Sequence, residues 1–349
     1  MTDDNYLLEC INNVTTDIHR YFITVHLTLG MKHYLDNNLE CRFIAAERTL
    51  KNANDQSKEI DPDLIFQYEN GTKGILGEIK SSLSHNELNV KNNVFEQLRK
   101  YDQDVIGWDS SDNLVENHDI LHLIHMLDSD WYISVYNKYE GSEIKLQKDY
   151  CIVEFTDLTS VKAGQGDIIL VRYKYGTLGC DSLLTKFKEN LHIEIDSLSN
   201  NYERLKFTRK RPPLAYLMDK LWFFIFTSFG RYNIDSDSFD VKLSEIIKIV
   251  QDYYYPWAGI EGENSQLRES WIKEALDMFV KINLAERIGT TAEQYRIHLR
   301  KKNLPNDMGK YIIEKICKKF IEEHPRKMID AQTSLDNFKM ESVKSKEDT

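Results

Sequence analysis

The sequence of 349 residues contains no apolar run long enough to cross a membrane. Its strongest run, residues 221–229, is far shorter than the roughly 20 residues that a spanning helix needs. The first residues, MTDDNYLLEC, are acidic and lack the basic start of a signal peptide. The five cysteines are odd in number and have no CxxC spacing, which indicates free thiols rather than a disulfide framework or a zinc site. These absences favour a cytoplasmic protein that does not enter the membrane.

Two common site motifs are also missing. The histidines at 118, 122 and 125 have no HExxH arrangement, and His122 and His125 would lie on opposite faces of a strand because they are three residues apart. The turn Gly164-Gln165-Gly166 lacks a third glycine and does not open a helix, so it does not predict a phosphate-binding loop. We therefore expect the histidines to be structural.

The composition is that of a globular chain with more than one domain. Hydrophobic residues make up 41% and charged residues 29%, and the length favours two domains. The net charge of −11 is unevenly distributed, since residues 201–349 hold 26 basic against 23 acidic residues. The rest of the chain is therefore strongly acidic, which supports a division into two parts with different surfaces.

The stretch EIDPDLIFQYENGTKGILGEIKSS, residues 59–82, predicts a β-hairpin. Two apolar runs, 64–66 and 75–76, flank the turn-forming residues 69–72. Asp63 stands at the start of the first strand, and Glu78 and Lys80 stand at the end of the second, on one face. An antiparallel hairpin brings these ends together, so two carboxylates and an ammonium group converge.

This combination suits metal-assisted hydrolysis of a phosphodiester. Two neighbouring carboxylates favour a hard divalent cation with oxygen ligands, such as Mg²⁺. Such a cation polarises the phosphate and lowers the pKa of a bound water, while a lysine can position that water and offset negative charge in the transition state.

At these residues the sequence resembles the PD-(D/E)xK, or restriction endonuclease-like, nuclease superfamily. Pro62-Asp63 matches the first part of the motif and Glu78-Ile79-Lys80 the second. Gln97 and Tyr101 have the QxxxY spacing of some branches of the superfamily, and the resemblance covers about residues 1–135. It implies a mixed α/β sheet flanked by helices.

The resemblance also implies the roles of the site residues. Asp63, Glu78 and the Ile79 carbonyl would bind Mg²⁺ or Mn²⁺, Lys80 would orient the attacking water, and Gln97 would touch a metal-bound water or a phosphate. Gln97 is equally well explained as an exposed helix residue. Glu47, with Glu40 behind it, is a candidate for one more acid, although both can be ordinary surface residues.

The pattern around the hairpin predicts the remaining elements of this domain. Three- and four-residue spacing predicts helices over 3–37 and 90–101, while apolar runs predict strands over 41–46 and 119–126. Three alternating segments predict added strands, over residues 131–136, 150–155 and 167–173.

The second domain follows a basic linker at 203–213. Apolar periodicity predicts helices over residues 214–229, 240–254, 265–282 and 307–324, with a strand–turn–strand at 284–297. Three helices followed by a hairpin resemble a winged-helix domain, which binds DNA or a protein. The resemblance makes candidate DNA contacts of Gln266, Arg268, Ser270, Lys273, Arg287, Arg296 and Arg300.

The predicted domains are therefore a nuclease domain over 1–202, the linker 203–213, a winged-helix-like domain over 214–327 and a disordered tail over 328–349. The predicted activity is Mg²⁺-dependent cleavage of DNA, of the kind used in restriction or phage defence. We expect the chain to form a homodimer and to act with a partner ATPase. Two alternatives stay open: an inactive DNA- or protein-binding regulator, and a nuclease that acts on RNA or branched DNA.

Overall fold

The structure is a computed structural model of the whole chain. It describes residues 3–38, 40–46, 48–83, 93–108, 115, 117–157, 159–160, 167–194, 211–229, 237–253, 269–289, 293–298 and 307–323. The chain groups into two compact units. We call Phe22–Lys210 with Tyr255–Ser265 the sheet unit, and Met1–Tyr21 with Arg211–Tyr254 and Gln266–Thr349 the helical unit. The first helix, α1 (Asp3–Asn38), contributes residues to both.

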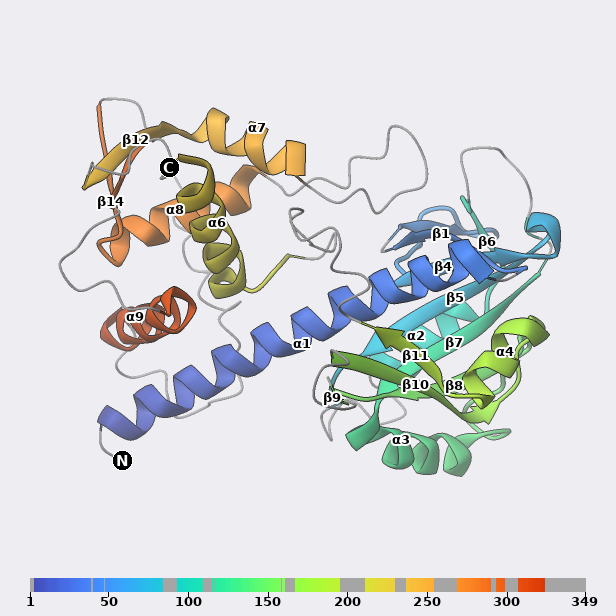
Figure 1. The fold of residues 1–349 in the computed structure, drawn as a ribbon. Coiled ribbons are helices and arrows are strands. Elements are labelled where there is room, and N and C mark those ends of the chain that lie inside the picture. The colour runs from blue at the N-terminus through green and yellow to red at the C-terminus, as the bar shows by residue number, and fades with distance from the viewer. Residues whose placement is uncertain are drawn as a thin grey trace. The chain divides into compact units, whose positions relative to one another are not determined.

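The sheet unit is built on a large mixed sheet (Figure 1). Its strand order is β1-β4-β5-β7-β8-β10-β11, with β9 paired to β10. The pairs β5–β7 and β7–β8 are parallel, and the other pairs are antiparallel. The strands are β1 (Arg42–Ala46), β4 (Leu64–Tyr68), β5 (Lys73–Lys80), β7 (Asn117–His125), β8 (Tyr150–Phe155), β9 (Thr159–Ser160), β10 (Asp167–Gly176) and β11 (Leu191–Glu194).

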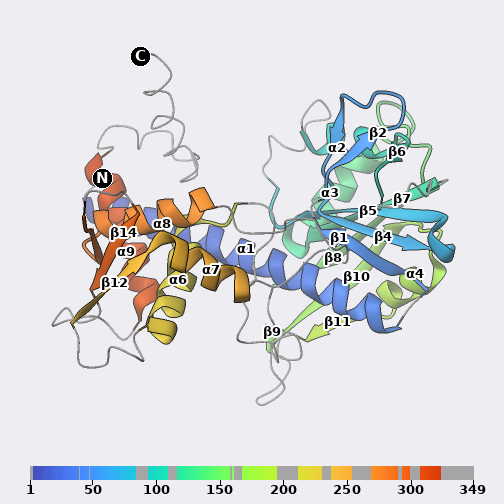
Figure 2. The ribbon, with the colours of Figure 1, turned by 90° about the horizontal axis from the view of Figure 1, so that it is seen from above.

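A small sheet and three further helices complete this unit. The small sheet has the order β3-β2-β6, from β2 (Leu50–Asn52), β3 (Glu59–Ile60) and β6 (Val105–Ile106). The helices are α2 (Asn93–Tyr101), α3 (Met126–Tyr139) and α4 (Asp181–Lys188). Figure 2 gives a second view of these elements.

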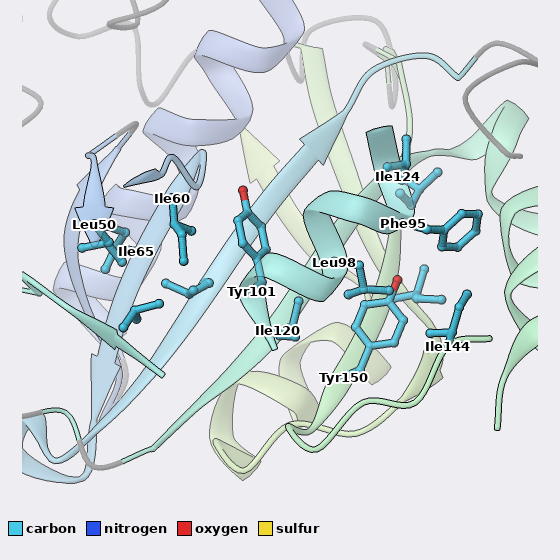
Figure 3. Packing of buried hydrophobic residues seen from close by; sticks show 14 of the residues in the cluster. Leu50, Ile60, Ile65, Phe95, Leu98, Tyr101, Ile120, Ile124, Ile144 and Tyr150 are labelled. Carbon is cyan, nitrogen blue, oxygen red and sulfur yellow. The ribbon is translucent and has the colours of Figure 1, made fainter. Parts of the chain in front are cut away.

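Alternation along the strands selects the face of the sheet on which α2 and α3 pack. Even-numbered positions of β7 and β8, such as Ile120, Ile124 and Tyr150, belong to one buried apolar cluster with Phe95 and Leu98 of α2 (Figure 3). Burial of these large side chains stabilises α2 against the sheet by roughly 1.5–3 kcal/mol each. This packing holds α2 over the hairpin of β4 and β5.

The prediction of a strand over 131–136 is wrong, because these residues lie inside α3. Their aromatic and β-branched side chains have high strand propensity, but Ser129, Tyr132 and Tyr136 are buried at three- and four-residue spacing. Packing of this stripe therefore outweighs local propensity. The helix α4 and the strand β11 were not predicted.

The helical unit contains four helices and a three-stranded sheet among its described residues beyond α1. The sheet order is β12-β14-β13, and all its pairs are antiparallel. The elements in chain order are α6 (Leu214–Phe229), β12 (Ser238–Lys242), α7 (Leu243–Tyr253), α8 (Glu269–Lys281), β13 (Ala285–Arg287), β14 (Gln294–His298) and α9 (Met308–Glu323).

The predicted helix over 240–254 is wrong at its start. Phe239 and Val241 are buried while Asp240 and Lys242 are exposed, and this two-residue alternation belongs to β12. The helix α7 begins only at Leu243. The predicted strands at 150–155 and 167–173, the hairpin, and the helices over 214–229 and 307–324 are confirmed within one to three residues.

The coarse fold class, a mixed α/β sheet flanked by helices, is confirmed. In the part of the chain that the structure describes, we find no helix with the length and apolarity of a membrane span. The linker 203–210, the turn 164–166 and the tail 328–349 lie outside the described residues.

Candidate active site

The hairpin of β4 and β5 brings the predicted acids together. Asp63 directly precedes β4, and the register Leu64 to Gly77 sets it beside Glu78 at the end of β5. Both carboxyl side chains are buried, since Asp63 is 4% and Glu78 2% exposed. Lys80 Nζ lies 2.7 Å from Glu78 Oε1, so the ammonium group of Lys80 faces the buried Glu78 carboxylate. Burying carboxylates is costly, which makes this arrangement unusual for a purely structural hairpin.

The segment around Pro62 fixes the position of the Asp63 carboxylate. Ile79 N–H donates a hydrogen bond of 2.7 Å to Asp63 Oδ2. Continuing the register beyond the Leu64–Gly77 pair places Pro62 opposite Ile79. Because proline has no N–H, Pro62 cannot donate to the Ile79 carbonyl in the usual ladder pattern. The strand β4 therefore begins only after Asp63, whose side chain accepts the hydrogen bond of the Ile79 amide.

Helix α2 completes the cluster from the other side. Gln97 Oε1 accepts a hydrogen bond of 3.0 Å from Lys80 Nζ, and Gln97 Nε2 donates 2.8 Å to the Tyr101 hydroxyl. The Tyr101 hydroxyl donates 2.6 Å to Glu78 Oε2. Gln97 thus lies in contact with the site rather than on an open helix surface, and Tyr101 has a role that its spacing alone did not assign.

The direction of these hydrogen bonds follows from the state of Tyr101. Burial, together with the nearby charges of Glu78 and Asp63, raises the pKa of the Tyr101 hydroxyl well above its usual range. The hydroxyl therefore keeps its proton and donates it to Glu78. It then accepts from the Gln97 amide nitrogen, which leaves the Gln97 carbonyl for Lys80. The network thus orients the lysine through α2.

Two histidines on β7, the strand paired with β5, hold the residues around this site. His118 Nε2 lies 2.6 Å from the Tyr101 carbonyl, and His122 Nδ1 lies 2.8 Å from the Tyr132 hydroxyl. Burial lowers the pKa of His118 to about 4 and that of His122 to about 3, so both are neutral near pH 7. The structure thus gives these two histidines hydrogen-bonded places in the core, and His118 anchors the end of α2.

The predicted ligands are oxygen atoms, which suit a hard divalent cation. Only two of the three ligands are side chains. Among the described residues, no group of three His, Cys, Asp or Glu side chains could hold a metal ion. Asp63 and Glu78 supply two carboxylates, and the third predicted ligand, the Ile79 carbonyl, is a main-chain oxygen. Glu78 also bonds Lys80 and Tyr101, so binding a cation would require it to share or exchange one of these partners.

Other predicted residues stand apart or outside the described residues. Glu40 is exposed, while Glu47 lies outside the described residues. On the helical unit, Arg287 Nη2 lies 2.7 Å from Asp277 Oδ1, and Arg296 pairs with Asp240 at 2.7 Å. Ser270 is exposed and Lys273 half-buried, whereas Gln266, Arg268 and Arg300 lie outside the described ranges.

Comparison with protein-family models, with curated protein sequences and with solved structures found no match in any of the three. The family resemblance therefore stays a prediction, and what the structure supplies is the placing of five side chains at one end of the hairpin: Asp63, Glu78, Lys80, Gln97 and Tyr101.

Proposed function

We propose that the chain is a metal-dependent nuclease that hydrolyses phosphodiester bonds in DNA. The observation that carries the proposal is the meeting of Asp63, Glu78 and Lys80 at one end of a buried hairpin. A folded core gains little from burying two carboxylates beside one lysine, whereas this chemistry requires them. The fold class and the hydrogen bonds from α2 support the same proposal.

The residues of the chain have separate roles in this proposal. Asp63, Glu78 and the Ile79 carbonyl would hold Mg²⁺ or Mn²⁺, which when bound supplies Lewis-acid activation of phosphate and water. Lys80 holds the attacking water and offsets charge on the phosphate oxygens. Gln97 keeps the ammonium group of Lys80 in place, and Tyr101 orients the Glu78 carboxylate.

The helical unit is proposed to be a winged-helix domain. Its order of elements, α6, β12, α7, α8, β13 and β14, and its central β14 strand support this assignment. Its part in DNA binding has weaker support, because Arg287 and Arg296 would have to leave their acidic partners to reach phosphates. A protein-binding role, for a second copy or a partner ATPase, suits the same topology.

The test is cleavage of plasmid and oligonucleotide DNA with Mg²⁺ or Mn²⁺ by wild type, Asp63→Ala and Lys80→Ala. The expected result is cutting by wild type and a loss of at least about 10³-fold in both variants. Lys73→Ala is the matched control, since Lys73 lies on the same strand and pairs with Glu69 at 2.8 Å at the other end of the hairpin. Equal cutting by all proteins, or no metal-dependent cutting by wild type with candidate partners present, contradicts the proposal.

A further inference from the structure

The side chain of His122 lies in the sheet next to the candidate active site. The parallel register of β5 with β7 pairs His122 directly with Glu78, and Ile124 with Lys80. Paired residues of neighbouring strands point to the same face of a sheet, so the imidazole and the Glu78 carboxylate share one face. His122 is fully buried, with an exposed fraction of 0%. It therefore belongs to the row of side chains that carries the predicted metal ligand.

Two tyrosines hold the Nδ1 end of the ring. His122 Nδ1 lies 2.8 Å from the Tyr132 hydroxyl and 3.0 Å from the Tyr150 hydroxyl, and the two hydroxyls lie 2.8 Å apart. Burial raises the pKa of both hydroxyls, so each keeps its proton. Both protons are used within this triangle only if one hydroxyl donates to the other and the second donates to Nδ1. Nδ1 is therefore an acceptor.

The other ring nitrogen, Nε2, consequently carries a proton. Burial lowers the pKa of His122 to about 3, and the charge of Lys80 adds to the effect, so the ring is neutral and has a single N–H group. Nε2 is buried and makes no hydrogen bond to any residue that the structure describes. Buried N–H groups without an acceptor are rare and unfavourable. This one suggests an acceptor that comes within reach when the site is in use.

The geometry of the ring directs Nε2 towards β5. Tyr150 lies on β8 and Tyr132 on α3, so Nδ1 faces the side of β7 on which β8 is paired. The two nitrogens of an imidazole bond in widely diverging directions, and β5 is paired to β7 on the other side. Glu78 is the residue of β5 in register with His122, and its carboxylate is the hydrogen-bond acceptor of that position.

We propose that His122 is a positioning residue of the candidate active site, whose Nε2–H group donates a hydrogen bond to the Glu78 carboxylate when that carboxylate binds a divalent cation. The inference rests on the proposed metal-dependent function. In the structure Glu78 Oε1 accepts from Lys80 and Oε2 from Tyr101. The ammonium group of Lys80 is repelled by a cation on Glu78, whereas the neutral Nε2–H group is not. Such a donor fixes the orientation of a ligating side chain.

The experiment measures the affinity of the full chain for Mn²⁺ from the electron paramagnetic resonance signal of the free ion. Asp63→Ala identifies the binding that belongs to the candidate site. His122→Asn keeps an oxygen near the position of Nδ1 and has no donor at that of Nε2. It is expected to weaken the Asp63-dependent binding about 10–100-fold. His122→Gln places an amide nitrogen near the position of Nε2 and is expected to bind like wild type.

This pair of variants distinguishes a positioning role from a packing role. If His122 only packed against the tyrosines, His122→Gln would be the more damaging variant, because it loses the acceptor for their hydroxyls. His26→Asn is the matched control. His26 is a buried histidine of α1, one turn before Gly30, which lies against Ile193 of β11 at the far edge of the sheet. It should leave Mn²⁺ affinity unchanged.

The outcomes separate this inference from the proposed function. Asp63-dependent Mn²⁺ binding that is equally tight in wild type and His122→Asn overturns the inference and leaves the proposed function intact. Wild type without such binding contradicts both. If His122→Asn fails to fold, wild type labelled with ¹⁵N-histidine is titrated with Mg²⁺. The Nε2–H proton of His122, identified by its loss in His122→Gln, is expected to shift downfield, and a proton that does not move overturns the inference.

Discussion

The two units of the molecule differ in whether they bury polar side chains. Within the described residues, every polar or charged side chain that is buried belongs to the sheet unit, from His26 to Thr156. The helical unit buries apolar and tyrosine side chains and keeps its ion pairs outside, as in Arg296 with Asp240, which are 42% and 50% exposed. Because burying polar groups costs free energy unless they are hydrogen-bonded, the core of the sheet unit depends on its hydrogen bonds more than that of the helical unit does.

The largest expected effect comes from neutralising a buried acid. Glu78→Gln should lower metal-dependent cleavage by at least about 10³-fold, since the amide retains an acceptor for Tyr101 but not a carboxylate for the cation. Its free energy of unfolding should fall by less than the roughly 3–5 kcal/mol typical of breaking a buried ion pair, because Lys80 is 20% exposed and keeps its bond to Gln97. Cleavage rates and urea unfolding measure the two quantities.

The exposed counterpart of that change is Asp240→Asn on the helical unit. It should leave the cleavage rate unchanged, because Asp240 pairs with Arg296 on the surface. Equal losses of activity in Glu78→Gln and Asp240→Asn would remove the functional distinction between the two units.

The next effect is a pH dependence of stability that arises in the sheet unit. The pKa values of His118, about 4, and His122, about 3, lie below the usual 6.5, so the unfolded chain binds more protons as the pH falls. The stability that the two neutral histidines contribute is fully present above pH 6.5, and it is lost as the pH falls towards 4 for His118 and 3 for His122. At pH 5 each histidine should lower the free energy of unfolding by about 2 kcal/mol relative to its value above pH 6.5.

Urea unfolding at pH 7.5 and pH 5 measures this loss. His118→Gln should remove about half of it, because the glutamine amide can donate to the Tyr101 carbonyl without titrating. An unchanged pH dependence in that variant would place the titrating groups elsewhere.

A smaller effect is expected from Tyr101→Phe. Loss of the hydroxyl removes the donor to Glu78 Oε2 and the acceptor for Gln97, so cleavage should fall by about 10–100-fold and stability by about 1–2 kcal/mol. Tyr68→Phe is the matched control, since it removes the hydroxyl bound to buried Asp119 away from the site. It should lower stability by a similar amount and leave the cleavage rate unchanged, and parallel losses of activity would contradict the role of Tyr101.

The smallest effect is expected from Arg296→Ala on the helical unit. Its pairs with Asp240 and Glu286 are exposed and screened by solvent, so the free energy of unfolding should hardly change. Duplex DNA affinity at fixed salt should not change, because the guanidinium group is occupied by acids. A clear loss of affinity, measured by fluorescence anisotropy, would show that the surface pair opens to bind phosphate.

The hairpin could be predicted because its signals are local. The apolar runs, the turn Glu69–Thr72 and the spacing of Glu78 and Lys80 determine both the strands and the meeting of their ends. The contact of Gln97 with Lys80 follows from the packing of α2 on the sheet, which the sequence spacing suggested without fixing.

Other features depend on partners far away in the chain. Residues 131–136 resemble a strand because of their β-branched and aromatic residues, and only packing against β7 and β8 makes them helical. The strand β12 needs its partner β14, more than 50 residues later, before its short alternation can be distinguished from the start of α7. His118 could be recognised as a support of α2 only once its bond to the Tyr101 carbonyl was visible.

The division of α1 has a consequence for the order in which the chain folds during synthesis. The helical unit unites residues 1–21 with segments that begin at Arg211, and the ring of Tyr21 packs 5.0 Å from the ring of Tyr216 on α6. These contacts have a very large sequence separation, whereas the sheet unit is nearly continuous from Phe22 to Lys210. The sheet unit can therefore complete its core while the ribosome is still translating, but the helical unit must wait for the last helix. A C-terminal truncation before α9 should consequently damage the N-terminal 21 residues as well.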